Sequence, residues 1–230
     1  NIEALIMVEV DNGDMIAGIY LLPMAPLSIQ QSYTLVRAEQ QTARRKLAQM
    51  ACVSFTRGTR ITMATGAQKP IEDLRPGDRV LTRDEGVQEL RWIGESTSRA
   101  VGRMAPVLIR AGALNNAADL LVSPDHRLLV YQRHDELGTG CPELLVRARD
   151  LVNGDTVVVQ DGGFVDYFQL LFDRHHIVYA EGIAAESLFL DALTQPALPD
   201  ELLRRLGTSH TSAQRRDGHG LEVQKALLDH

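Results

Sequence analysis

The sequence predicts an all-β protein, because short apolar runs recur along the middle of the chain and turn-forming clusters separate them. The expected strands cover residues 60–63, 79–82, 89–93, 107–110, 120–122, 127–131, 156–160 and 176–180. The clusters between them include Arg75-Pro76-Gly77-Asp78, Asn153-Gly154-Asp155 and Asp161-Gly162-Gly163. Glycine accepts positive φ, and Asn or Asp side chains bond their own backbone, so each cluster favours a tight turn. Many short strands at this spacing favour a β body over alternating helices and strands.

An internal repeat predicts that this body has two related halves. The pattern Asp73-Leu74-x-x-Gly77-Asp78-x-Val80 returns as Asp150-Leu151-x-x-Gly154-Asp155-x-Val157, always 77 residues later. Asp84 and Gly86 return at the same spacing as Asp161 and Gly163. The repeated unit is expected to be a short helical turn, a glycine turn and a strand. A common turn used twice is the alternative, and the constant spacing argues against it.

Residues 1–53 form a separate, β-rich segment ahead of this body. The apolar runs 6–10 and 17–22 flank the turn-rich Asp11-Asn12-Gly13-Asp14, which predicts a hairpin. Residues 32–36 are expected to add a third strand. Residues 39–50 are polar and basic and are expected to form a linker or a short helix.

The last part of the chain, residues 191–230, is a tail in which only short helices or disorder are expected. Residues 201–206 and 221–228 favour short helices. The polar segment 207–220 is expected to lack fixed structure.

Composition excludes several classes of protein. Hydrophobic residues make up 44% and charged residues 23%, which is ordinary for a globular chain, and the net charge of −6 disfavours nucleic-acid and anionic-membrane partners. No stretch approaches the ~20 apolar residues of a membrane span. Cys52 and Cys141 are too few for a disulfide framework or a four-cysteine metal site, although one bridge between them stays open. Asn1 is not a start methionine, so a preceding signal peptide, and with it export, also stays open.

Three motifs in a fixed order resemble the Hint superfamily, which contains intein splicing domains and hedgehog autoprocessing domains. They are Ser54-Phe55-Thr56-Arg57-Gly58-Thr59-Arg60-Ile61, Val122-Ser123-Pro124-Asp125-His126-Arg127, and the stretch 168–187. The first is similar to the Cys-Phe-x-x-Gly-Thr-x-Ile opening of a bacterial branch. The resemblance covers residues 54–190 and implies a pseudo-twofold Hint fold that attacks its own backbone.

The resemblance implies that Ser54 is the nucleophile and that the scissile bond is Val53–Ser54. Ser54 would attack the carbonyl of Val53 and turn the amide into an ester, an N–O acyl shift, and a second nucleophile of unknown identity would cleave that ester. The substrate would be the chain's own segment 1–53, and no cofactor is expected. A serine hydroxyl is a poorer nucleophile than a thiolate and needs more help from a base.

The resemblance also implies the groups that assist Ser54. Within Ser123-x-x-His126, which is similar to a Thr-x-x-His motif, His126 would donate a proton to the departing nitrogen and Ser123 would orient the amide or an oxyanion. His176 matches a late catalytic histidine. Gln169 stands where the family places His, Asp or Cys, and glutamine takes no proton at a useful pH. Asp173 is expected, with His175 as the alternative, to orient His176.

Other readings of these residues stay open. The Ser54 and Gln169 substitutions favour a degenerate module with a structural or targeting role, whereas an ordinary serine hydrolase lacks support because no Gly-x-Ser-x-Gly is present. No terminal asparagine follows Gly182, so full splicing is not expected. Cys52, two residues before Ser54, is the alternative nucleophile if the register of the first motif differs from the one given above.

A metal site is not expected either. His175 and His176 are neighbours, and adjacent residues of a strand face opposite sides. The acidic turns lack the spacing of an EF-hand calcium loop.

Overall fold

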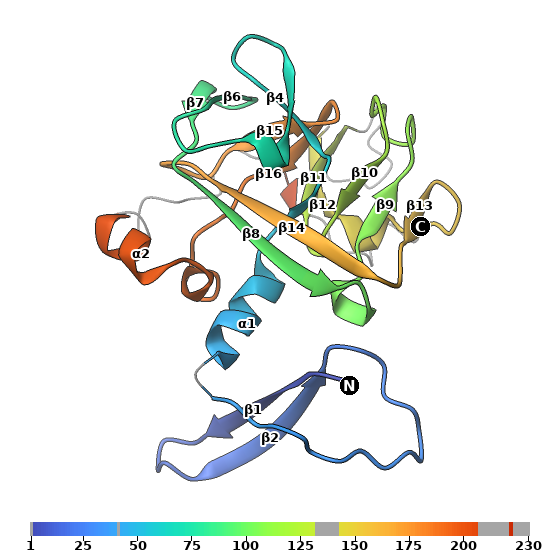
Figure 1. Ribbon diagram of the computed structural model, residues 1–230, viewed down its shortest axis with the longest axis vertical. Helices are drawn as coiled ribbons and strands as arrows, with labels where there is room; N and C mark the ends of the chain where they lie inside the picture. Colours follow the sequence, from blue (N-terminus) through green and yellow to red (C-terminus); the bar gives the residue numbers. More distant parts are fainter. Residues whose placement is uncertain (1, 41, 132–142, 207–220, 223–230) are drawn as a thin grey trace.

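Two sheets, antiparallel except where β17 joins β12, make up the body of the protein, which confirms the all-β prediction. The computed structural model describes residues 2–40, 42–131, 143–206 and 221–222 (Figure 1). The first sheet contains, in spatial order, β13 (Val157–Val159), β9 (Val107–Ile109), β10 (Leu120–Val122), β3 (Phe55–Thr56), β14 (Phe164–Leu171) and β8 (Trp92–Arg99). Nearly every strand is short, and the longest pairing joins β14 to β8.

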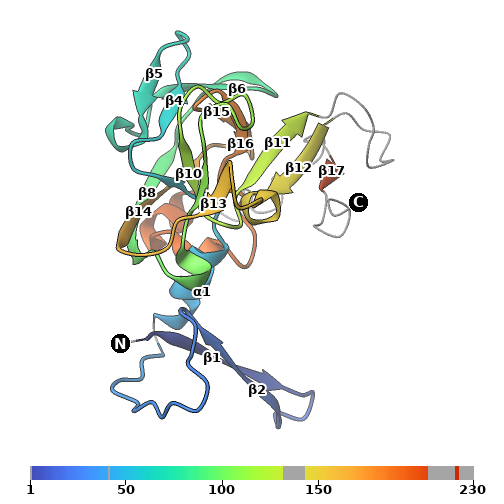
Figure 2. The same cartoon turned by 90° about the vertical axis from the view of Figure 1, so that its right-hand side faces the viewer.

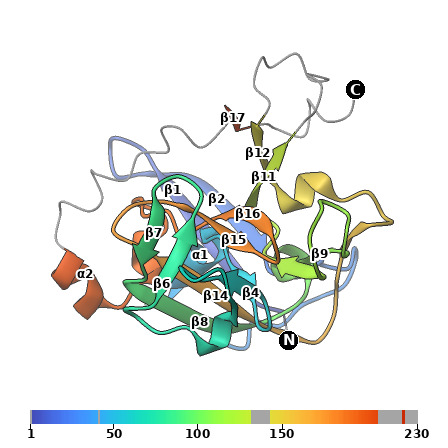
Figure 3. The same ribbon diagram turned by 90° about the horizontal axis from the view of Figure 1, so that it is seen from above.

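The second sheet stands beside the first and carries a hairpin off its main path (Figure 3). Its order is β17 (Leu221–Glu222), β12 (Glu143–Arg147), β11 (Arg127–Tyr131), β16 (Ile183–Glu186), β15 (Ile177–Ala180), β4 (Arg60–Thr62) and β5 (Gln68–Pro70). The hairpin consists of β6 (Arg79–Thr82) and β7 (Gly86–Glu89), and it joins the sheet where Val178 pairs with Thr82.

The repeated unit has the predicted form in both halves. A 3₁₀ turn, η1 (Ile71–Asp73), leads through Gly77 to β6, and η3 (Ala148–Leu151) leads through Gly154 to β13. Gly77 has φ 95° and Gly154 has φ 78°, which is the left-handed region that a side chain disfavours. The glycines are therefore needed where the sequence repeats them.

The N-terminal segment is a hairpin followed by a helix. Strands β1 (Ala4–Val10) and β2 (Ile16–Pro23) pair with each other, and α1 (Ala43–Ala51) runs from the hairpin toward the body (Figures 1 and 2). The Asp11 carboxylate accepts the N–H groups of Gly13 and Met15 and so closes the turn. The hairpin and the helix were both predicted.

Three predicted elements are wrong. Residues 32–36 form no strand, because their side chains are exposed and neither strand of the hairpin pairs with them. Residues 89–93 are not one strand: the chain leaves the β6–β7 hairpin after Glu89 and begins β8 at Trp92, since the N–H of Leu90 returns to Asp78 O and that of Arg91 goes to Leu171 O. Residues 221–222 belong to β17 and not to a helix.

The tail contributes one helix to the body. It begins with a 3₁₀ turn, η4 (Gln195–Ala197), and continues as α2 (Asp200–Leu206), which confirms the helix expected at 201–206. The predictions for 207–220 and for 223–228, like any bridge to Cys141, lie outside the described residues. No helix of the described part is long and apolar enough to cross a bilayer.

Two apolar clusters hold the start of the first motif. The main core lies between the sheets and includes Phe55, which is 1% exposed. A second cluster joins Cys52 to the end of β14 and to the tail through Leu171, Leu188, Leu190 and Leu198. Burial thus anchors the backbone on both sides of Val53–Ser54. One further 3₁₀ turn, η2 (Gly102–Met104), lies between β8 and β9.

Candidate active site

Sheet register places three of the predicted residues around one peptide bond. Strand β3 lies between β10 and β14, with Phe55 paired to Val122 on one side and to Phe168 on the other. Ser54 directly precedes β3, Ser123 directly follows β10, and Gln169 follows Phe168 within β14. Because both pairings are antiparallel, these three residues must meet at one level of the sheet.

The Val53–Ser54 peptide bond is buried and held through its own N–H group. Ser54 is 2% exposed and Val53 is 6% exposed. The N–H of Ser54 donates to Ser123 Oγ at 3.0 Å, and the N–H of Ser123 donates to Ser54 O at 2.8 Å. Ser123 therefore touches the nitrogen that would leave in an acyl shift.

The hydroxyl of Ser54 has two partners among the described residues, and neither is a base. Gln169 Nε2 donates to Ser54 Oγ at 2.7 Å, while Ser54 Oγ donates to Cys52 O at 3.4 Å. Gly94 stands opposite Gln169 on β8, and a Cβ there would lie 2.6 Å from Gln169 Oε1. A glycine at this place leaves room for the glutamine to reach the nucleophile.

His126 lies fully buried with a carbonyl oxygen at each ring nitrogen. Its Nδ1 is 3.0 Å from Ser54 O, and its Nε2 is 3.1 Å from Glu186 O. The ring also packs against Phe55, with 4.4 Å between centroids. Burial lowers the pKa of His126 to about 4, although both carbonyl contacts and the charge of Glu186 act to raise it. The ring is therefore neutral at pH 7, the form that accepts a proton.

The lowered pKa of His126 predicts a loss of stability in mild acid. The unfolded chain takes up a proton near pH 6.5, whereas the folded chain does so only near pH 4, so the unfolded state binds more protons in that window. The free energy of unfolding should fall by about 3 kcal/mol as the pH drops through it. Urea titrations at pH 7, 6, 5 and 4 measure the fall.

His126→Gln is the matched control for this prediction. The two proteins share every other titrating group, so the difference between their curves isolates His126. An equal slope in both proteins between pH 6.5 and 4 contradicts the prediction.

Two of the predicted residues do not reach Ser54 in this structure. The Nδ1 of His176 lies 2.6 Å from Asp84 Oδ2, and the N–H of His176 donates to Ser187 Oγ. Asp173 is exposed and pairs with Arg91 instead of His176. The expectation that Asp173 or His175 orients His176 is wrong, because the hairpin that carries Asp84 folds over the start of β15.

The adjacent histidines turn to different acidic groups. His176 faces Asp84, whereas the Nε2 of His175 lies 3.4 Å from Glu186 Oε1. Neither Asp84 nor Glu186 was identified as a site residue from the sequence. Asp84 could have been singled out in the sequence because it belongs to the repeat. Glu186 could not, because only the pairing of β16 with β11 brings it beside His126.

Cys52 does not suit the alternative role of nucleophile. It is 1% exposed, and burial raises the pKa of its thiol to about 12, with a smaller contribution from the charge of Asp191. The reactive form of cysteine is the thiolate, which this environment suppresses at neutral pH.

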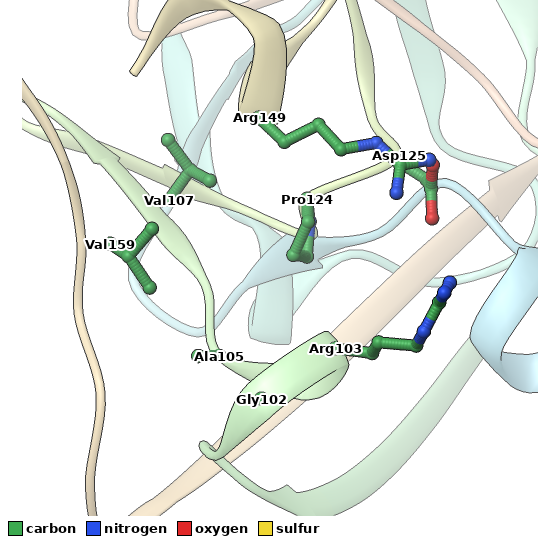
Figure 4. Close-up of a pocket in the computed structure, with 8 residues that line it drawn as sticks. All are labelled: Gly102, Arg103, Ala105, Val107, Pro124, Asp125, Arg149 and Val159. Atoms are coloured by element: carbon green, nitrogen blue, oxygen red, sulfur yellow. The ribbon is translucent and has the colours of Figure 1, made fainter. Parts of the chain in front are cut away.

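A small cavity borders the loop that carries Ser123 and His126. Its volume is about 230 Å³, and the loop residues Pro124 and Asp125 form one wall (Figure 4). Arg149 pairs with Asp125 there, and its N–H donates to Pro124 O. These contacts help to fix the loop.

The chain is similar to known Hint and intein domains. The family model described as Hint domain matches residues 53–192. Similar solved structures include an Ssp DnaB mini-intein variant (16% identity, 60% of this chain and 97% of that chain, TM-score 0.40) and a DnaB intein from Synechocystis sp. PCC 6803 (13%, 59% and 98%, 0.39). A bacterial intein-like domain from Clostridium thermocellum is also similar (16%, 58% and 97%, 0.38). A search of curated proteins finds no match. Since the family model covers more than half of the residues, the chain belongs to the Hint domain family.

Proposed function

We propose that this chain is an autoprocessing domain that cleaves itself between Val53 and Ser54. The observation that carries the proposal is the setting of that peptide bond: its N–H donates to Ser123 Oγ, and His126 Nδ1 lies within hydrogen-bond distance of Ser54 O. A nucleophile, a hydroxyl on the leaving nitrogen and a neutral imidazole meet at one buried bond. These are the parts that an acyl shift needs.

In the first step, Ser54 Oγ attacks the carbonyl carbon of Val53. A C–O bond forms, the C–N bond of the scissile peptide breaks, and the proton of the hydroxyl ends on the nitrogen of Ser54. No outside acid or base is consumed. His126 carries the proton: its neutral ring accepts it from Oγ and delivers it to the nitrogen, while Ser123 keeps that nitrogen in place.

In the second step, water or another nucleophile attacks the ester carbonyl of Val53. The C–O bond breaks, and the proton of the attacking group passes to Ser54 Oγ. Residues 1–53 leave as a peptide with a new C-terminus, and residues 54–230 keep a free amine and hydroxyl on Ser54. The hairpin and the whole of α1 would then be released from the body.

One observation favours a second candidate, a folded module that no longer cleaves. Gln169 donates to Ser54 Oγ, so it occupies a lone pair of the nucleophile and takes no proton from it. In this role the domain would keep the Hint fold as a structural or targeting element. The two candidates differ in whether the purified chain breaks.

The test is the intact mass of the purified chain over several days at pH 7 and 25 °C, beside Ser54→Ala. Autoprocessing predicts two fragments that meet between Val53 and Ser54, and no fragments from Ser54→Ala. If the wild-type chain stays whole while circular dichroism shows that it is folded, the second candidate stands.

A further inference from the structure

A fully buried carboxylate lies next to the candidate site, at the end of β16. Glu186 is 0% exposed. Its Oε2 lies 3.3 Å from Arg127 Nη1, and its Oε1 lies 3.4 Å from His175 Nε2. A buried charge is costly unless it is compensated, so the placement of this glutamate between a cation and an imidazole needs a reason.

The backbone of Glu186 connects this cluster to His126. The carbonyl oxygen of Glu186 lies 3.1 Å from His126 Nε2. On either side the chain is fixed, since Ala185 pairs with Leu128 and the N–H of Ser187 donates to His176 O. The backbone oxygen that touches the catalytic ring is therefore held in place by its own strand.

The two carbonyl groups around His126 constrain where its proton sits. A neutral imidazole has one N–H, so it donates to only one of the two oxygens and presents a lone pair to the other. With the hydrogen on Nε2, the ring bonds Glu186 O, and Nδ1 is the basic nitrogen, 3.0 Å from the carbonyl oxygen of Ser54. The imidazolium satisfies both oxygens, but its charge is then buried.

The charged groups acting on His126 are Glu186, whose charge favours the imidazolium, and Arg127, whose charge opposes it. Arg127 is 13% exposed in its side chain and is itself paired to Glu186, which offsets its effect. The ring of Phe55 covers another side of the imidazole and offers no charge. Glu186 is thus the acidic group placed to balance a proton on His126.

We infer that Glu186 is the positioning residue of His126: its carbonyl holds the hydrogen on Nε2, and its carboxylate balances the charge while the ring carries the proton of Ser54. Arg127 pairs with the carboxylate, and His175 lies beside it. The inference rests on the proposed function, because it assigns Glu186 to the proton transfer of the acyl shift. It goes beyond that function by naming the group that stabilises the imidazolium form of the buried His126.

The first test needs no cleavage. Long-range ¹H–¹⁵N spectra of ¹⁵N-histidine-labelled protein at pH 7 report which ring nitrogen of His126 carries the hydrogen, with His126→Gln to identify the signals. The inference predicts the Nε2–H form in wild type and in Glu186→Gln, which keeps the carbonyl. In the same spectra recorded from pH 7 downward, the ring of Glu186→Gln should take up its proton at a lower pH than that of wild type, because the balancing carboxylate is gone. A wild-type ring protonated on Nδ1 overturns it, and that result depends on no variant of Glu186 folding.

The second test measures the acyl shift. Saturating hydroxylamine makes that step rate-limiting. Under this condition Glu186→Gln should cleave about tenfold more slowly than wild type, which is less than the ~10²–10⁴-fold rate contribution of a general acid–base group itself. Glu186→Asp should recover part of the rate. Glu181→Gln is the matched control, since Glu181 is 3% exposed and accepts the N–H of Arg60, away from His126.

Equal rates for Glu186→Gln and Glu181→Gln, with unchanged His126 spectra, overturn the inference and leave the proposed function intact. If no variant cleaves, the proposed function fails, and the spectra alone decide whether Glu186 positions the ring.

Discussion

Replacing Ser54 by cysteine should turn this chain into a fast self-cleaving protein. The scissile nitrogen is already bonded to Ser123, and His126 already faces the serine, so the substitution changes the nucleophile and little else. A thiol loses its proton far more readily than a hydroxyl, and Gln169 supplies no base to help the hydroxyl. We expect Ser54→Cys to form its thioester faster than wild type forms its ester, by a factor on the order of 10²–10⁴, the range that a missing base would cost.

Dithiothreitol-induced cleavage of Ser54→Cys, followed by mass spectrometry, measures this effect. Ser54→Ala controls for contaminating proteases, and Ser54→Cys combined with Cys52→Ser shows that the nearby buried thiol takes no part. If folded Ser54→Cys stays whole in dithiothreitol, the remaining groups do not form a working site, and the domain is a structural relic.

The second large effect is expected at His126. In the Ser54→Cys background, His126→Gln should slow fragment release by about 10²–10⁴-fold, because glutamine fills the space but carries no proton between Oγ or Sγ and the nitrogen. The fully buried ring contacts Ser54 O directly, so its loss acts on the reacting residue. Time courses at pH 7 with dithiothreitol give the rate ratio.

His176→Gln gives the contrast for this experiment. Its ring is bonded to Asp84, and no contact joins it to Ser54 in the described residues. It should lower thermal stability through the lost contact with Asp84 while cleavage stays much faster than in His126→Gln. Equal losses of rate at the two histidines contradict the arrangement of groups described above.

The local parts of this fold could be predicted from the sequence, and the long-range parts could not. The turn at Asp11–Gly13 and the two glycine turns of the repeat depend on residues a few positions apart, so their chemistry is visible in the chain. The strands that were not predicted include β3, β5, β12, β14 and β16, which are short, lack clear alternation or lie within a motif. Their place depends on partners far along the chain.

The same division holds for the candidate site. Ser54, Ser123, His126 and Gln169 were identified from motifs, and the register of β3 between β10 and β14 brings them together. The partner of His176 was placed three residues away at Asp173, whereas it is Asp84, 92 positions earlier. Proximity in sequence is a poor guide when a hairpin folds over the start of another strand. Glu186 escaped notice for a related reason, since its buried contacts come from β11 and from the turn before β15.

The central claim is that the acyl group of Val53 passes to the oxygen of Ser54, and hydroxylamine tests it most directly. Hydroxylamine attacks esters and leaves ordinary amides intact at neutral pH, so the fragment 1–53 is released as a hydroxamate at Val53. We predict that the wild-type chain incubated with hydroxylamine yields this hydroxamate, identified by the mass of its C-terminal peptide, and that Ser54→Ala yields none. A wild-type chain that releases no hydroxamate under excess hydroxylamine, or a fragment 1–53 that also appears from Ser54→Ala, would contradict the account.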